Sequence, residues 1–470
     1  MKEQNILQQM QELYQSNDEA ITRQIDCGLQ ITLMSLETMC DDKKISAFVL
    51  QPLVYLQEAT SVQQVRLKIS TGAIVKDITN VYTAVDLFTN GYTLVFGADG
   101  SFAVDTRTTL GRAIIEPPTS MVMKGPREGF VEDLKVNITL LRKRLKTEHF
   151  KIVNATVGKY TNTSISVCYL QTIADQRIVD NIVQRLQNIN IDGVLDSSYI
   201  SKYLDPSRTV LFRRVGMTEK PDIAVAKMLE GRVCVVVDGS PMVLTLPYLY
   251  VEDLQSPSDY YENASITTLN RALRFISVVL SVLLPALYVC LQMYNYQIIP
   301  LKFLITILNA TEAIPFSPMV EMMIVLIIFD ILREANLRMP SAVGISLSLV
   351  GAIVLGDAAV KAGLIGAPAV MIGALSGIGL FTMPNNTFIL SLLRIAITLI
   401  GGIMGILGVI LSVVAILIYM VSLQNYQAPF LAPYAPNIPA DKQDAVGQHP
   451  LTEQVERPRS IPNVNKRRRG

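Results

Sequence analysis

The sequence has 470 residues, and its 41 Lys and Arg nearly balance its 40 Asp and Glu, so the net charge of +1 gives no indication of nucleic acid binding. Its two histidines and five cysteines show no metal-ligand spacing, and it contains neither a P-loop nor a G-x-G-x-x-G segment, which argues against an enzyme and against a metal or other cofactor. Half of the residues are hydrophobic, but residues 1 to about 270 have an ordinary soluble composition, whereas residues 275–423 are dominated by Leu, Ile, Val, Ala, Gly and Met.

The N-terminus, MKEQNILQQMQELYQSNDE, has no apolar core and is therefore not expected to be a secretory signal peptide. Arg271 and Arg274 precede the first strongly apolar segment, which begins near Phe275. Because basic residues flanking a first span stay in the cytoplasm, we expect the large N-terminal region to be cytoplasmic. The chain has five cysteines, and an odd number in a cytoplasmic protein predicts reduced thiols.

A weak internal repeat divides the soluble region. The stretch from Gln30 resembles the stretch from Ser164, each reading as an alternating strand, a polar turn and a helix. Later, GYTLVFGADGS from Gly91 resembles GRVCVVVDGS from Gly231, each ending in a turn-forming Asp-Gly. The sequence therefore predicts two related α/β subdomains in tandem, residues 1–124 and 151–270, followed by an α-helical polytopic membrane domain.

Residues 125–150 are predicted to connect the subdomains through a basic amphipathic helix. The helix is expected to begin after Gly125-Pro126, which interrupts the preceding secondary structure. Four cations lie at its end: Arg142, Lys143, Arg144 and Lys146. Two interpretations remain open. The favoured one is a solvated basic face that suits the helix dipole, and the other is a surface that docks a partner subunit or anionic lipid.

The membrane domain, residues 271–423, is expected to cross the bilayer four to six times, and a Pro-rich basic tail, residues 424–470, follows it. The predicted spans are 275–293, 318–332, two runs within 341–383, and 388–423, which Gly401-Gly402 could divide. Residues 298–308 are interpreted as interfacial or re-entrant. The basic end of the chain favours an even number of crossings, with both termini inside.

Charged and small residues inside this domain are candidates for an ion path, since an ionised group facing lipid is costly. Glu321 and Asp330 are nine positions apart, so one helix alone cannot hide both on one side. Asp357 and Lys361 are four apart and can meet on one helix face. Small and hydroxyl residues precede them, at Gly344, Ser346, Ser348, Gly351 and Gly356. For the two acids, a structural pair with Arg333 or Arg394 is the competing interpretation.

From about residue 25 to 458, the sequence resembles a known family, the A subunits of GerA-type spore germinant receptors. The resemblance is carried by several stretches in order: GPREGF from Gly125, the run from Asn137 to Lys146, DGSP from Asp238, DYY from Asp259, LPALYV from Leu284, REANLRMP from Arg333 and APFLAPYAP from Ala428. The chain departs from the family at Lys220, where an arginine is usual, and a lysine does not give bidentate contacts.

The resemblance implies an integral protein of the spore inner membrane, with its N-terminal region and its C-terminus on the spore core side. Family members work with a transporter-like B subunit and a lipoprotein C subunit. Their A subunits are thought to form a ring around a cation channel that opens when the B subunit binds nutrient. A paralogue group encoded with the dipicolinic acid transport proteins shares this architecture. On this basis, partner or ring contacts are expected at Arg127, Glu128 and the four cations from Arg142 to Lys146.

Two other functions compete with the channel. A secondary transporter would usually carry inverted repeats in its membrane half, whereas the repeat here lies in the soluble half. A non-conducting scaffold that only docks other subunits would show no conductance, and its embedded acids would be structural. The channel interpretation places the 344–361 helix along the ion path, with Glu321 and Asp330 facing the interior.

Overall fold

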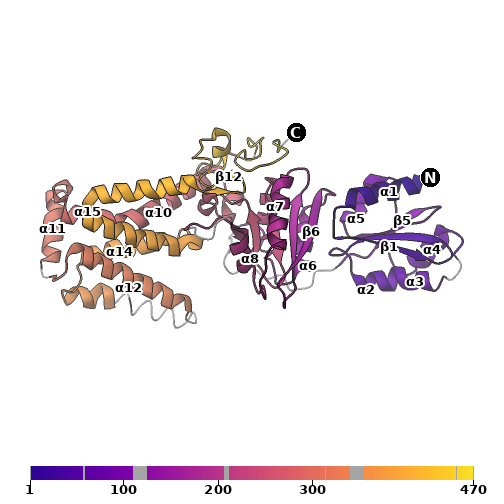
Figure 1. Cartoon of the computed structure of the whole chain (residues 1–470), viewed down its shortest axis with the longest axis horizontal. Helices are drawn as coiled ribbons and strands as arrows, with labels where there is room; N and C mark the ends of the chain where they lie inside the picture. Colours follow the sequence, from indigo (N-terminus) through magenta and orange to yellow (C-terminus); the bar gives the residue numbers. More distant parts are fainter. Residues whose placement is uncertain are drawn as a thin grey trace.

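The computed structural model describes residues 2–56, 59–108, 124–205, 211–312, 314–338, 351, 354–450 and 452–468. Two β-sheet subdomains and a helical region follow one another along the long axis of the molecule (Figure 1). The N-terminus lies at the end of this axis opposite the helical region, and the C-terminal tail lies beside the second subdomain (Figure 1).

The first subdomain is a five-stranded sheet with the order β1-β2-β4-β5-β3, in which all neighbouring strands are antiparallel. Its strands are β1 (Ala20–Asp26), β2 (Gln30–Leu36), β3 (Val75–Asp77), β4 (Tyr92–Phe96) and β5 (Ser101–Asp105). Its helices are α1 (Lys2–Tyr14), α2 (Asp42–Ile45), η1 (Ser46–Leu50), α3 (Gln51–Val54), α4 (Val62–Ser70) and α5 (Val81–Thr89).

The second subdomain repeats this arrangement with the order β6-β7-β9-β10-β8, again antiparallel throughout. Its strands are β6 (Phe150–Val157), β7 (Thr163–Leu170), β8 (Gly216–Thr218), β9 (Val233–Val237) and β10 (Val243–Leu246), and its helices are α6 (Leu134–Arg144), α7 (Gln176–Gln187), α8 (Ser197–Leu204) and α9 (Pro221–Leu229). The strands matched by sequence, β2 with β7 and β4 with β9, occupy equivalent places. The predicted tandem of related subdomains is confirmed.

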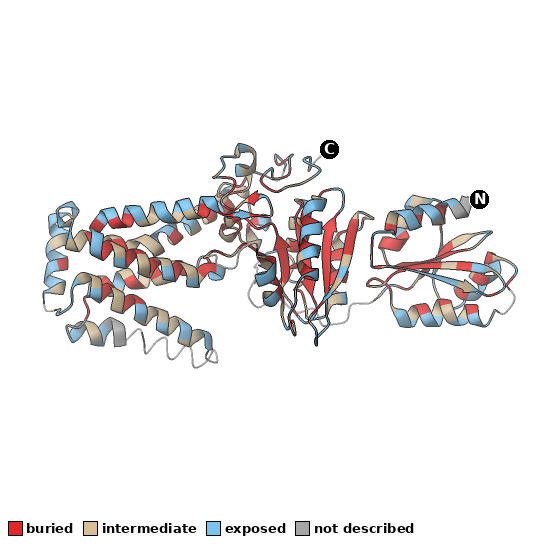
Figure 2. Ribbon diagram, in the orientation of Figure 1, coloured by how far each residue is buried: buried red, intermediate tan, exposed pale blue. Residues whose placement is uncertain are grey.

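Alternation along the strands explains why helices cover both faces of the second sheet. On β9, Val233, Val235 and Val237 pack into one core, while Cys234 and Val236 pack into the core on the opposite face. Every residue of this strand is buried, as expected for a central strand covered on both sides (Figure 2).

The basic helix differs from the expectation in its start and in its role. Residues 125–133 are not helical, and α6 begins at Leu134, where the Asp133 side chain accepts a hydrogen bond from the Val136 amide at 3.0 Å. Ile138, Leu140 and Leu141 pack against the second sheet. We therefore describe α6 as a helix of the second subdomain rather than a free connector.

The helical region begins after two short 3-10 helices, η2 (Tyr250–Leu254) and η3 (Pro257–Tyr261). Its helices are α10 (Ala264–Met293), η4 (Tyr296–Ile298), α11 (Leu301–Thr311), α12 (Pro318–Arg338), η5 (Val354–Ala359), α14 (Ala367–Leu380), η6 (Pro384–Asn386) and α15 (Thr387–Ser422). Helix α11, the expected interfacial piece, lies at the end of the bundle farthest from the sheets (Figure 1).

Helix α15 is a hairpin rather than one long rod. Gly405 has φ 67° and ψ −153°, a backbone conformation that only glycine adopts readily. At one end of the hairpin Asn386 donates to Asp253 at 2.6 Å, and at the other Tyr419 accepts from the Leu211 amide at 3.0 Å, so both ends lie beside the second subdomain. The division expected at Gly401-Gly402 thus occurs at Gly405. Each arm of about 17 residues is about 26 Å long, close to a bilayer core of about 30 Å.

The helical region places apolar side chains on its outside. Within the part of the chain that the structure describes, two stretches, Ala264–Met293 and Pro384–Ser422, are long and apolar enough to cross a membrane. Only 22% of the most apolar window of the second is buried. Large apolar side chains are exposed along both arms of α15, among them Leu399, Ile403, Leu407, Ile410, Leu411, Leu417 and Ile418. A helix that formed the core of a soluble protein would bury these side chains.

The C-terminal tail folds back on the second subdomain instead of extending freely. It contains the short pair β11 (Gln424–Asn425) and β12 (Ala428–Pro429) and the 3-10 helix η7 (Pro439–Gln443). Asn463 forms a bridge with Ala174, and the Arg457 guanidinium donates to the carbonyl of Leu229 at 2.7 Å. The tail and both sheets therefore lie at the same end of the helical bundle.

Candidate functional site

Asp330 is the centre of a buried ion-pair network between three helices. Its carboxylate lies 2.9 Å from the Arg394 guanidinium of α15 and 3.2 Å from that of Arg333, one turn along α12. It also accepts a hydrogen bond from Ser391, and Arg394 donates to Ser376 of α14 at 3.0 Å. Asp330 thus pairs with both Arg333 and Arg394, the two arginines that the structural interpretation of this acid proposed as partners.

Glu321 lies inside the bundle with 1% of its surface exposed. Its Oε1 accepts a hydrogen bond of 2.6 Å from the backbone amide of Gly366, the residue that precedes the first turn of α14. A carboxylate is favourable at that position because the first amides of a helix lack partners within the helix. A side chain at residue 366 would meet this carboxylate, since a Cβ there would lie 3.0 Å from Oε1.

The predicted pair of Asp357 and Lys361 forms, with 2.7 Å between the carboxylate and the ammonium group. Both side chains are exposed, at 59% and 74%, so no described helix of this chain covers them. Gly351 lies against Leu332 of α12, and Gly356 is part of η5. The other candidates of this segment, Gly344, Ser346 and Ser348, lie outside the described residues.

The six predicted contact residues do not form one exposed surface. Arg142 is fully buried and pairs with Glu19 of the first subdomain, with its guanidinium 4.5 Å from the ring centre of Phe150. Arg144 pairs with Glu128 at 2.5 Å. Arg127, Lys143 and Lys146 are exposed. The interpretation of a continuous basic face is therefore wrong for Arg142, which is covered because the two subdomains meet over it.

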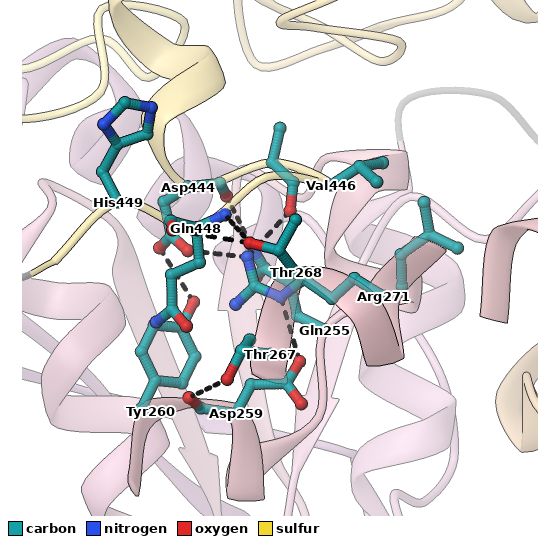
Figure 3. A network of polar contacts seen from close by, with 12 residues as sticks. Gln255, Asp259, Tyr260, Thr267, Thr268, Arg271, Asp444, Val446, Gln448 and His449 are labelled. Carbon is teal, nitrogen blue, oxygen red and sulfur yellow. Dashed lines mark hydrogen bonds and ion pairs between the residues drawn. The ribbon is translucent and has the colours of Figure 1, made fainter. Parts of the chain in front are cut away.

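A second network, which sequence reasoning missed, joins the start of α10 to the tail (Figure 3). Arg271 is fully buried and lies 3.0 Å from Asp259 of η3 and 2.8 Å from Asp444 of the tail. Arg274 binds the same Asp259 at 2.7 Å, and Thr268 accepts from the Gln448 amide at 2.9 Å. The only signal in the sequence was the pair of arginines before the first apolar segment, which we interpreted as topology markers.

The electrostatics of Asp259 show how tightly this network is built. Burial alone would raise the pKa of Asp259, but hydrogen bonds from Arg274, the Ser256 amide and Arg271 outweigh burial and hold its pKa below the ordinary value. Asp259 therefore stays ionised between the two guanidinium groups. The junction fixes the direction in which α10 leaves the second subdomain.

Within the described residues, no group of three or more His, Cys, Asp or Glu side chains could hold a metal ion. The two ion-pair networks are suited to a structural role instead of metal binding. They hold charged groups inside the helical region and clamp that region to the second subdomain and the tail.

The sequence is similar to known proteins over nearly its whole length. The chain is 32% identical over 480 residues to "Spore germination protein KA" of Bacillus subtilis (strain 168), covering 99% of this chain and 88% of the relative. It is 29% identical over 464 residues to "Spore germination protein GerQA" of Bacillus cereus, covering 96% and 91%. Among solved structures, the N-terminal domain of the A subunit of the Bacillus megaterium spore germinant receptor GerK3 is 23% identical with a TM-score of 0.40, covering 52% of this chain and 94% of that domain.

The family comparison extends over nearly the whole sequence. The sequence profile described as "Bacillus/Clostridium GerA spore germination protein" matches residues 8–460, which include both sheets, the helical region and most of the tail. The chain therefore belongs to the GerA family of spore germination proteins.

Proposed function

We propose that this chain is the A subunit of a nutrient-sensing spore germinant receptor. Copies of it would assemble into a ring around a cation-conducting path in the spore inner membrane. A transporter-like B subunit would bind the nutrient, and a lipoprotein C subunit would complete the receptor. Membership of the GerA family supports the proposal, as do the names of its relatives in Bacillus subtilis and Bacillus cereus.

The observation that carries the membrane part of this proposal is the inverted polarity of the helical region. Apolar side chains cover its outside while Glu321, Asp330 and Arg394 lie within it. Only a lipid or protein environment avoids exposing such a surface to water. Because the sheets and the tail lie at the same end of the bundle, we place both on one side of the membrane. Arg271 and Arg274 favour the spore core side.

The proposed ring and ion path are supported by polar groups that the described part of the chain leaves uncovered. Asp357 and Lys361 are exposed beside Gly356, in a region where most exposed side chains are apolar. We propose that the 344–361 segment faces the axis of the ring, with its small and hydroxyl residues lining water. Nutrient binding would then open the path by favouring the open ring over the closed one.

A specific observation favours a second candidate, a non-conducting scaffold. The carboxylates of Glu321 and Asp330 are engaged by Gly366, Arg333 and Arg394, which are contacts that stabilise a packed bundle. In the channel proposal these two acids therefore support the bundle, and ions pass along the 344–361 segment, in which Asp357 and Lys361 are exposed.

Single-channel recording from the full-length protein, with and without its B and C partners, tests the proposal. The informative variant is Asp357→Asn, and Glu334→Gln is its matched control, because Glu334 is 57% exposed and forms the same type of four-residue pair with Arg338. We expect cation-selective openings whose conductance changes with Asp357→Asn and not with Glu334→Gln. Silence in every combination, from protein shown to be assembled, would establish the scaffold instead.

A further inference from the structure

A groove opens among the helices on the side of the bundle near the second subdomain. It has a volume of about 280 Å³ and lies between α12, α14 and the first arm of α15. Its walls are mostly apolar and include Phe329, Leu332, Ala374, Ile378, Leu380 and Phe381. No atom of the described residues lies within 4 Å of the position that a Cβ of residue 377 would occupy, so the groove is open at that point. Asp330, Arg333 and Arg394 also line it.

The charged groups of this groove are not balanced. One carboxylate, Asp330, faces the two guanidinium groups of Arg333 and Arg394, which leaves one positive charge in excess. Arg394 is fully buried, and among the described residues neither its Nε nor Nη1 of Arg333 has a hydrogen-bond partner. An unpaired cation in a region of low dielectric is costly, so the groove is complementary to a single negative charge that accepts hydrogen bonds from both arginines.

The position of the groove corresponds to the head-group level of a bilayer. Leu380, at its edge, packs with Leu254 of η2, the segment that connects the second subdomain to α10. At the same end, α12 finishes with the exposed pair of Glu334 and Arg338, which needs water or head groups around it. The distance along α12 from Asp330 to Arg338 is about 12 Å at ~1.5 Å per residue.

A second copy of this chain cannot readily supply the missing charge. The carboxylates between residues 275 and 423 are Glu312, Glu321, Asp330, Glu334 and Asp357. Glu321 and Asp330 are occupied inside the bundle, and Glu334 and Asp357 are paired on its surface. Glu312 caps the C-terminus of α11, the helix at the end of the bundle farthest from the sheets (Figure 1). In a ring, whose copies share one orientation in the membrane, none of these meets the groove unpaired.

We propose that the groove binds the phosphate of an anionic phospholipid from the leaflet next to the second subdomain. Nη1 of Arg333 and Nε of Arg394 would donate to the phosphate oxygens, and an acyl chain would lie along Phe329, Ile378 and Phe381. A lipid with one net negative charge, such as phosphatidylglycerol, neutralises the groove, whereas the choline of phosphatidylcholine restores the excess charge. This inference rests on the proposed location of the helical region in a bilayer.

Native mass spectrometry of the full-length protein tests this assignment, after release from nanodiscs that contain equal amounts of phosphatidylglycerol and phosphatidylcholine. Arg333→Gln removes one donor while Arg394 still pairs with Asp330. Gly377→Leu fills the groove without changing a charge. Arg338→Gln, on the exposed end of the same helix, is the matched control. Glycerol 3-phosphate is added in a parallel sample to distinguish a lipid from a free phosphate.

We expect the wild type and Arg338→Gln to retain phosphatidylglycerol selectively, and Arg333→Gln and Gly377→Leu each to lower this retention about tenfold, because each loses a charge-assisted contact or the space for it. Glycerol 3-phosphate should not displace the lipid. Equal retention in all four proteins, no preference over phosphatidylcholine, or displacement by glycerol 3-phosphate would overturn the proposal. If Arg333→Gln no longer self-associates but retains phosphatidylglycerol as the wild type does, the groove is a contact between subunits and the proposal is overturned. Channel openings that persist without lipid selectivity would refute this inference alone and leave the proposed function intact.

Discussion

Replacing Glu19 by Gln should loosen the contact between the two sheet subdomains. Glu19 and Arg142 pair across that contact with 1% and 0% of their side chains exposed. Removing the carboxylate leaves the Arg142 guanidinium buried and uncompensated, which typically costs about 3–5 kcal/mol. The same contact contains an exposed pair, Lys135 with Glu37 at 2.7 Å, whose loss should cost about 0–1 kcal/mol. Glu37→Gln is therefore the matched control.

Hydrogen exchange in the full-length protein measures this effect directly. The Asp18 amide donates to the Ile152 carbonyl at 3.2 Å, and the Asn154 amide donates to the Asp18 side chain at 2.7 Å, so both amides report on the contact. If these two amides exchange with solvent when the contact between the subdomains opens, a loss of about 3 kcal/mol increases their exchange rates by about 100-fold or more.

A double variant, Glu19→Gln with Arg142→Met, should be milder than the sum of the two single variants, because no uncompensated charge remains. Exchange in Glu19→Gln that matches Glu37→Gln would refute the reasoning. So would strict additivity in the double variant.

Three further predictions concern the junction and the hairpin. Asp259→Asn should release the tail, because Arg271 and Arg274 lose their shared carboxylate at a cost of about 3 kcal/mol or more. Limited proteolysis of residues 424–468 should then become faster, whereas Glu262→Gln, in a partly exposed pair with Lys124, should not change it. The pKa of Asp259 is lowered on folding, so its stabilisation is complete above the ordinary value of 3.8 and is lost as the pH falls from there through the lowered pKa. Hydrogen exchange of the tail, relative to the intrinsic rate at each pH, should therefore accelerate only below pH 3.8. Gly405→Ala should destabilise the hairpin by about 1–3 kcal/mol and lower the melting temperature of the detergent-solubilised protein, since alanine is strained at φ 67° and ψ −153°; an unchanged melting temperature would show that the turn relaxes.

The local patterns of the sequence predicted local structure well. Alternating apolar residues marked β2 and β7, and apolar runs before an Asp-Gly turn marked β4 and β9. The repeat between them predicted two related subdomains, and the structure shows that their sheets share one strand order. The pair of Asp357 and Lys361 followed from a four-residue spacing on one helix. The hairpin in α15 was expected from a pair of glycines, but its turn lies at Gly405, because the sequence shows several glycines and does not show which one adopts a positive φ.

What only the tertiary structure decided is the identity of the partners of the buried charges. Arg142 looked like one cation of a basic run, and its burial depends on Glu19, which lies 123 positions away. Asp330 meets Arg394 across 64 positions, and Arg271 meets Asp444 across 173. A sequence determines backbone preferences and which face of an element is apolar, since both depend on neighbouring residues. The pairing of distant charges depends on how the elements pack, and that arrangement decided which charged residues support the bundle and which remain open to a partner, an ion or a lipid.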